Sequence, residues 1–206
     1  MKFVLFHGAF GGPEGNWFPE LKEKLESFGQ EIIAPQFPVD DWDEVTKKGY
    51  SVPPQNQNLK NWLSTFEQLV LPQLKKGDEL CFIGHSLGPL FILHVVEKFN
   101  LKLDSAIFVS PFLRKLNESW QIDHVNSSFY KVDFDFEKLK KYISQSWVFY
   151  TDNDPYVKKE YALEFADKLN TNRIFIKRAG HFNEESGYTK FNELTQHIKD
   201  KILTHF

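Results

Sequence analysis

Cysteine is almost absent from this sequence: Cys81 is the single cysteine among 206 residues. One cysteine can form neither a disulfide framework nor a thiolate metal site within one chain, which favours a reducing compartment. Long hydrophobic runs are missing too, since no stretch approaches the ~18 to 20 apolar residues of a membrane span. The four apolar residues from Phe3 to Phe6 are too few for a signal peptide. We therefore expect a soluble, cytoplasmic protein without a membrane partner.

Blocks of one charge are also missing. The formal net charge is −3, and acidic and basic residues are interspersed along the chain, with no Lys/Arg cluster that could follow a phosphate backbone. Nucleic acid is therefore not an expected partner. The length suits one compact domain, so residues 1–206 are expected to form a single domain. It would act as a monomer or a small homo-oligomer.

Short β-branched and aromatic runs alternate with longer segments of helical period. This pattern is typical of a βαβ series around a buried parallel sheet. The expected strands are residues 2–6, 31–34, 79–83, 105–109, 147–151 and 173–176. Helices are expected after caps at Asn16, Asn58 and Asp135, over 87–99, and around 161–169 and 191–203. The sequence thus predicts an α/β fold with helices on both faces of the sheet.

Two connections are longer than ordinary βα loops. One covers residues 37–57, and the other runs from Pro111 to about Ser146. Long loops above the carboxyl edge of a parallel sheet usually form the binding site. Aromatic residues in or near such loops are candidates for substrate binding, and we select Phe10, Phe112 and Trp120.

The strongest chemical signal is the run Gly84-His85-Ser86-Leu87-Gly88, between a predicted strand and a buried helix. A nucleophile in a tight strand-to-helix turn needs small residues two positions before and after it, and both are glycine here. The turn also places Ser86 at a helix N-terminus, where free N–H groups stabilise negative charge. Ser86 is therefore the candidate nucleophile, although an ordinary helix cap would also use serine.

A nucleophilic serine needs a base and a carboxylate that orients it, and both follow later strands. Asp152 and Asp154 come after the fifth predicted strand, and His181 comes after the sixth. All three would lie at the sheet edge that also carries Ser86. Pro155 fixes the backbone after Asp154, which favours this carboxylate as the partner of His181. Asp152 is then expected to accept main-chain N–H groups of the loop.

The other six histidines are poorer candidates for the base. His94, His197 and His205 are expected in helices away from this edge, His124 in a long loop, and His85 beside Ser86 but pointing elsewhere. His7 ends the first predicted strand and is the main rival. Its place before the acid reverses the expected chain order, so we assign it a structural hydrogen bond in the following loop.

The loop His7-Gly8-Ala9-Phe10-Gly11-Gly12 is suited to donating a main-chain N–H to an oxyanion. The candidate oxyanion donors are the N–H groups of Ala9 and Leu87. A nucleotide site is the alternative use of such glycines. Their spacing is not G-x-G-x-x-G, and no acidic residue ends the second predicted strand, which makes that alternative weak.

Together these segments resemble the small serine hydrolases typified by retinoblastoma-binding protein 9 and its bacterial relatives. The resemblance extends over nearly the whole chain and includes Asn16-Trp17-Phe18-Pro19, Val109-Ser110 and Gly180-His181-Phe182. It implies a compact α/β-hydrolase fold with about six mostly parallel strands and no large cap domain. It also implies a triad of Ser86, Asp154 and His181. The retinoblastoma-binding L-x-C-x-E motif does not occur, because Glu79 and Ile83 flank Cys81.

The expected activity is hydrolysis of a small ester or amide through an acyl-enzyme intermediate. No cofactor or metal is implied. Two alternatives remain open. One is a protein-interaction module on a hydrolase fold, in which Ser86 is a relic. The other is an acyltransferase or thioesterase.

Overall fold

Six parallel strands form one sheet at the centre of the protein. In the computed structural model, which describes residues 1–203, their order is β2-β1-β3-β4-β5-β6. The strands are β1 (Lys2–Phe6), β2 (Glu31–Ile33), β3 (Leu80–His85), β4 (Leu103–Val109), β5 (Ile143–Tyr150) and β6 (Asn172–Phe175). All five neighbouring pairs are parallel. The predicted α/β-hydrolase fold is confirmed, with strand ends shifted by up to four residues.

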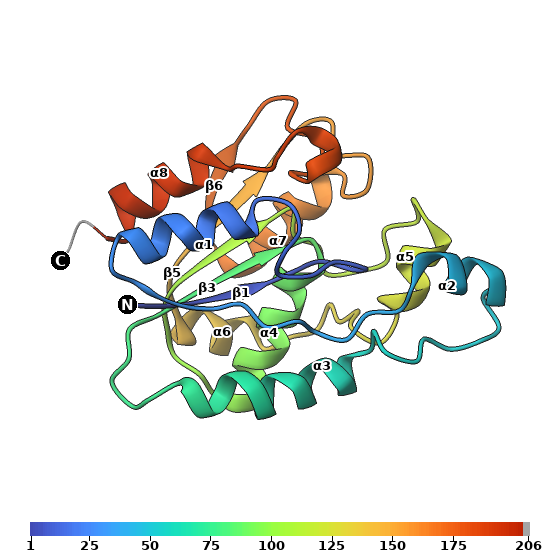
Figure 1. Ribbon diagram of the computed structural model, residues 1–206, viewed down its shortest axis with the longest axis horizontal. Coiled ribbons are helices and arrows are strands. Elements are labelled where there is room, and N and C mark those ends of the chain that lie inside the picture. Colours follow the sequence, from blue (N-terminus) through green and yellow to red (C-terminus); the bar gives the residue numbers. More distant parts are fainter. Residues whose placement is uncertain (204–206) are drawn as a thin grey trace.

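Helices cover both faces of this sheet (Figure 1). The helices are α1 (Phe18–Ser27), α2 (Trp42–Lys48), α3 (Leu59–Thr65), α4 (Leu87–Phe99), α5 (Trp120–Val125), α6 (Phe136–Tyr142), α7 (Lys159–Leu169) and α8 (Asn192–Lys201). A π-helical turn (Phe66–Val70) and a 3-10 turn (Leu71–Gln73) extend α3. Helices α1 and α8 pack on one face, and α3, α4, α6 and α7 on the other.

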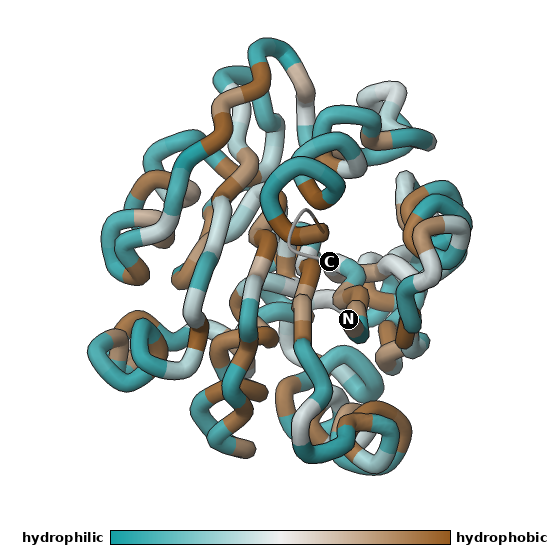
Figure 2. The backbone as a smooth tube through the Cα atoms, turned by 90° about the vertical axis from the view of Figure 1, so that its left-hand side faces the viewer, coloured by the Kyte–Doolittle hydropathy of each residue, from teal (hydrophilic) through white to brown (hydrophobic). Residues whose placement is uncertain are grey.

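Alternating side chains of each central strand supply the two halves of the core. In β1, Val4 and Phe6 face the cluster under α4, whereas Phe3 and Leu5 face the cluster under α1 and α8. Helix α4 is buried over nearly its whole length, as its apolar sequence predicts. Hydrophobic and hydrophilic stretches alternate along the surrounding helices (Figure 2). None of the described helices is long and apolar enough to span a membrane.

The caps expected at Asn58 and Asp135 are confirmed, because each side chain accepts a main-chain N–H three residues later. The cap expected at Asn16 is wrong. Helix α1 begins after Trp17 without a side-chain cap, and Asn16 Oδ1 instead accepts the N–H of Glu184 at 3.0 Å. Asn16 therefore connects the loop after β1 to the loop that carries His181.

The two long connections contain helices that the sequence pattern did not predict. Helix α2 lies in the first, and α5 lies in the second, where β5 also begins three residues before the expected end of the loop. The sheet order reverses beside β1, since the chain places β2 on one side of it and β3 on the other. The loops that leave β1 and β3 therefore diverge at their carboxyl ends, which is the usual ligand site of an open α/β sheet.

Candidate active site

A cavity of about 530 Å³ opens at the carboxyl ends of β1 and β3. Its walls come from six segments: the loop after β1, the turn between β3 and α4, helix α2, the stretch around α5, and the loops after β5 and β6. The lining residues are 7–12, 15, 16, 42, 85, 86, 116, 122, 156, 181 and 183–185. Ser86 and His181 thus border the same cavity.

Ser86 sits in a strained turn between β3 and α4. Its φ and ψ angles are 60° and −104°, a conformation that residues other than glycine rarely adopt. Two glycines make room for it, as predicted. A Cβ on Gly84 would lie 2.6 Å from the nitrogen of Pro89, and one on Gly88 would lie 2.3 Å from the main-chain oxygen of Phe6. The tight packing holds the Ser86 side chain at the cavity wall.

The loop after β1 passes directly beside Ser86. A Cβ on Gly8 would lie 2.9 Å from Ser86 Cβ and 3.4 Å from Ser86 Oγ. Ala9 lines the cavity, and Leu87 is the first residue of α4, whose N–H has no acceptor within the helix. The N–H of Phe10 does not point to the cavity as a free donor, because it donates to Gln57 Oε1 at 2.9 Å.

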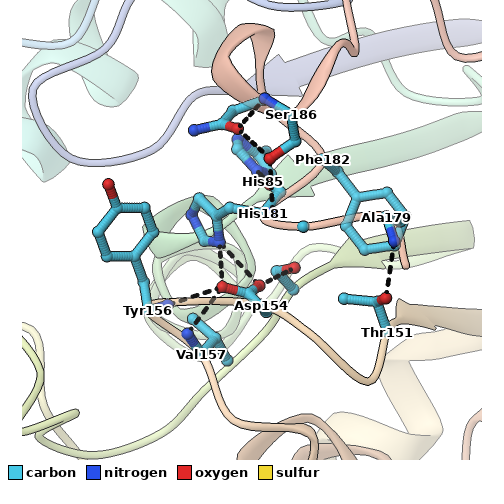
Figure 3. Close-up of polar contacts among 12 residues, drawn as sticks. His85, Thr151, Asp154, Tyr156, Val157, Ala179, His181, Phe182 and Ser186 are labelled. Carbon is cyan, nitrogen blue, oxygen red and sulfur yellow. Dashed lines mark hydrogen bonds and ion pairs between the residues drawn. The ribbon is translucent and has the colours of Figure 1, made fainter. Parts of the chain in front are cut away.

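The side chains of His181 and Asp154 are joined by hydrogen bonds (Figure 3). His181 Nδ1 lies 2.8 Å from Asp154 Oδ2 and 3.0 Å from Oδ1. A carboxylate can only accept, so Nδ1 carries the proton and Nε2 is the nitrogen left for other chemistry. The loop after β5 supplies the acid and the loop after β6 supplies the imidazole, as the sequence predicts.

Asp154 is held by three further hydrogen bonds. Ser110 Oγ donates to Oδ2 at 2.8 Å, and the N–H groups of Tyr156 and Val157 donate to Oδ1 at 2.9 Å each. Burial alone would raise the pKa of Asp154. The hydrogen bond and charge of His181, with the two main-chain N–H groups, outweigh burial and hold the pKa below its usual value. The carboxylate is therefore ionised and fixed in orientation.

The loop before His181 is fastened by the three residues that precede Asp154. Asp152 Oδ1 accepts the N–H of Arg178, Thr151 Oγ1 that of Ala179, and Asn153 Oδ1 that of Gly180, at 2.8 to 2.9 Å. Asp152 thus accepts a loop N–H, the task expected for it from the sequence. The acid-bearing loop both bonds to the imidazole and supports the backbone that presents it.

The remaining histidines that the structure describes have other roles. His7 accepts the N–H of Phe37 at Nε2 and donates from Nδ1 to the Gly8 oxygen, the structural role expected for it. Burial lowers the pKa of His7 to about 4. His94 bonds to the main-chain oxygen of Phe129 and His124 to that of Val52, and the ring of His197 lies against β5. His205 lies outside the described residues.

The three aromatic residues selected for substrate binding have different environments. Phe10 lines the cavity, with φ at 55° and its ring 5.1 Å from that of Trp42. Phe112 is fully buried in the core, and Trp120 packs on Tyr50 outside the cavity lining. The structure therefore brings only Phe10 of these three to the cavity.

Several lining residues were not anticipated from the sequence. Trp42, Leu116 and Ile122 come from the inserted segments, and Tyr156 lies two residues after Asp154. Glu184 and Glu185 follow His181 closely in the chain, which is the only signal that could have indicated them. Among residues 1–203, they are the only residues of the Asp, Glu, Lys and Arg types that line the cavity.

Residues 1–203 contain no evident metal-binding site. Within that range, no group of three or more His, Cys, Asp or Glu side chains could hold an ion. Cys81 is fully buried in β3, and burial raises the pKa of its thiol to about 12. It is therefore not a reactive thiolate at neutral pH.

The chain is similar to known proteins in both sequence and fold. Residues 3–200 match the family model described as "Serine hydrolase". The chain is 25% identical to YdeN of Bacillus subtilis (strain 168) over 187 residues, which cover 90% of this chain and 87% of that protein. The solved structure of the B. subtilis ydeN product superposes with a TM-score of 0.79 at 22% identity, covering 96% of both chains.

A second solved structure is more distant in sequence. It is Est1E from Butyrivibrio proteoclasticus with ferulic acid bound, which has a TM-score of 0.68 at 15% identity and covers 98% of this chain and 88% of the other. Likeness at these identities concerns the fold.

Proposed function

Because the chain belongs to the serine hydrolase family, we propose that it hydrolyses small carboxylic esters or amides, with Ser86 as nucleophile, His181 as general base and Asp154 as the orienting carboxylate. One observation carries the proposal. His181, which is hydrogen-bonded to the buried Asp154, borders the same cavity as the strained Ser86 turn. A helix-capping serine would need neither this strain nor an imidazole with one nitrogen bonded to a buried carboxylate.

Acylation begins with proton transfer from Ser86 Oγ to His181 Nε2. The Oγ then attacks the carbonyl carbon, and the C=O π electrons move onto the carbonyl oxygen, which becomes an oxyanion. Asp154 remains ionised and stabilises the imidazolium that forms, since its pKa lies below the ordinary value. The imidazolium next donates its proton to the leaving alcohol or amine as the C–O or C–N bond breaks.

The main-chain N–H groups of Ala9 and Leu87 are the proposed oxyanion donors. The close approach of Gly8 to Ser86 supports this assignment, because it places the loop after β1 beside the attacking oxygen. Leu87 opens α4, so its N–H points out of the helix end that favours negative charge. Removing one such donor typically costs about 10²- to 10³-fold in kcat.

Deacylation reverses the roles of the same groups. His181 takes a proton from water, the hydroxide oxygen attacks the acyl carbon, and the Ser86 Oγ leaves with the proton returned by His181. The product is a carboxylic acid, and the enzyme is regenerated without a cofactor. A cavity of about 530 Å³ suits a small substrate. A carboxylic ester is preferred because no separate cap domain covers the site within residues 1–203.

Turnover of 4-nitrophenyl acetate by the wild type and by Ser86→Ala tests this proposal. We expect the wild type to show a burst equal to the enzyme concentration, followed by steady hydrolysis, and the variant to show neither. Product analysis with an added alcohol separates the acyltransferase alternative, which predicts a new ester in place of acid. A folded wild type without turnover on a panel of esters, thioesters and amides favours the interaction-module alternative.

A further inference from the structure

The backbone around His181 is tied to two other parts of the chain through its carbonyl groups. His85 Nε2 donates to the main-chain oxygen of His181 at 2.7 Å, and Trp17 Nε1 donates to that of Phe182 at 2.9 Å. The two donors differ in origin. Trp17 precedes α1, whereas His85 is the residue directly before Ser86.

His85 is fixed at both its main chain and its ring. His85 is the last residue of β3, and its main chain pairs with Val109 of β4. The residue is 3% exposed, and the centroid of its ring lies 5.9 Å from that of Trp17 and 4.8 Å from that of His181. The bond from Nε2 therefore spans from the rigid centre of the sheet to the loop that carries the base.

The proton on the His85 ring can be assigned from its partner. A carbonyl oxygen only accepts, so Nε2 carries the hydrogen and Nδ1 of the neutral ring does not. Nδ1 is buried and has no hydrogen-bond partner within residues 1–203. Burying an unpaired acceptor costs free energy, which an apolar ring of similar size would avoid. The Nε2 bond is the feature that a histidine adds at this position.

We propose that His85 is a positioning residue, which sets the placement of His181 relative to Ser86 through its hydrogen bond to the His181 carbonyl. This inference rests on the proposed function, because it assumes that Ser86 and His181 react with each other. Nucleophile and base come from different strands, and His85 links the two directly through one side chain. Misplacing reacting groups by about 1 Å can cost 10²-fold in rate.

The charge state of His85 is consistent with this role. Burial lowers the pKa of His85 to about 3, so its ring is neutral at neutral pH. During acylation His181 becomes positively charged, and a cationic neighbour at 4.8 Å would oppose that step. A neutral ring can hold the loop without this repulsion.

Two substitutions of similar shape test the bond. His85→Gln keeps an N–H donor at about the reach of Nε2, and His85→Met has the same length without a donor. Trp17→Phe removes the neighbouring bond to Phe182 but keeps an aromatic ring beside His85. It is the matched control, because its donor is not part of the nucleophile turn. The readouts are burst and steady-state kinetics on 4-nitrophenyl acetate, with the melting temperature of each variant.

We expect His85→Met to lower kcat by 10- to 100-fold with KM within about two-fold, and His85→Gln to recover most of the loss. Trp17→Phe is expected to lower the melting temperature but to keep kcat within about three-fold. The proposal is overturned if His85→Met keeps wild-type kcat, if His85→Gln is as impaired as His85→Met, or if kcat follows melting temperature across all three.

A measurement without turnover separates this proposal from the proposed function. Nitrogen-15 NMR of the wild type is expected to show His85 protonated at Nε2 and bare at Nδ1 at neutral pH. In His85→Met, the ring signals of His181 are expected to shift, whereas in Trp17→Phe they move little. Protonation of His85 at Nδ1, or unchanged His181 signals in His85→Met, would contradict the proposal even if no substrate were found.

Discussion

The carboxylate of Asp152 accepts the main-chain N–H of Arg178 at 2.8 Å. Two residues later, Asp154 bonds to the side chain of His181 at the same distance. One loop thus carries two carboxylates with different partners, a backbone and an imidazole. Asp152 is exposed and Asp154 has only 2% of its side chain exposed, which makes their replacement by asparagine an informative comparison.

Replacing Asp154 by Asn is expected to lower kcat by as much as ~10⁴-fold, because the amide favours the wrong tautomer of His181 and removes the charge that stabilises the imidazolium. Asp152→Asn is expected to cost less than about ten-fold, since an amide oxygen can still accept the Arg178 N–H. Steady-state kinetics on one activated ester measures both. The reverse order of effects, at matched melting temperatures, would make Asp152 the partner of His181.

Gly88 is expected to be intolerant of a side chain. The Cβ of Gly88→Ala would lie 2.3 Å from the Phe6 main-chain oxygen, so β1 or the start of α4 has to move. We expect a loss of about 1 to 3 kcal/mol in the free energy of unfolding, together with lower activity from the displaced Ser86 turn. Gly15→Ala is the control, because its nearest new contact is an ordinary 3.7 Å. Equal stability of the two variants in urea would refute this account of the turn.

The stability of the protein is expected to rise with pH between about 4 and 6.5. Burial lowers the pKa of His7 to about 4 and that of His85 to about 3. In this window the unfolded chain binds protons at both histidines and the folded protein does not, so raising the pH favours the folded state. Each histidine contributes a slope of up to about 1.4 kcal/mol per pH unit.

Urea unfolding at several pH values measures this slope directly. The variant His85→Met is expected to show a smaller slope than the wild type, because it lacks one of the histidines whose pKa burial lowers. A wild-type stability that falls with rising pH in this window, or an unchanged slope in the variant, would show that these rings are not buried in neutral form.

Charge at the cavity predicts a preference among substrates. Glu184 and Glu185 lie at its wall, so esters with a carboxylate on the leaving group are expected to react more slowly than neutral analogues. The effect is expected to be a few-fold, since both side chains are exposed and salt screens them. The ratio of kcat/KM for the two esters, at low and high salt, measures it. The double variant Glu184→Gln, Glu185→Gln is expected to bring this ratio toward one.

Much of this fold could be predicted from sequence because strand and helix periods are local properties. The strands are short apolar runs, and α4 is apolar all round because sheet and helices enclose it. Helices α2 and α5 gave no such signal. Val45 is the single buried residue of α2, and the buried face of α5 includes the polar residues Asp123 and His124.

The candidate site was predictable only in part, because some of its contacts join residues that are far apart in the sequence. Ser86, Asp154 and His181 follow strands, and the sheet brings strand ends together. Asn16 looked like a helix cap, but its partner is Glu184, 168 residues away. Phe112 looked like a loop aromatic, but the chain after β4 continues into the core. Such contacts depend on the tertiary structure, which local patterns do not encode.

Labelling with a fluorophosphonate, followed by mass spectrometry, tests the central claim most directly. An activated serine reacts with this reagent and gains one phosphonyl group, whereas ordinary serines do not. We predict a single adduct on the peptide that contains Ser86, and none in Ser86→Ala of unchanged stability. Labelling of another residue, or none in the folded wild type, would contradict the assignment of Ser86 as the nucleophile.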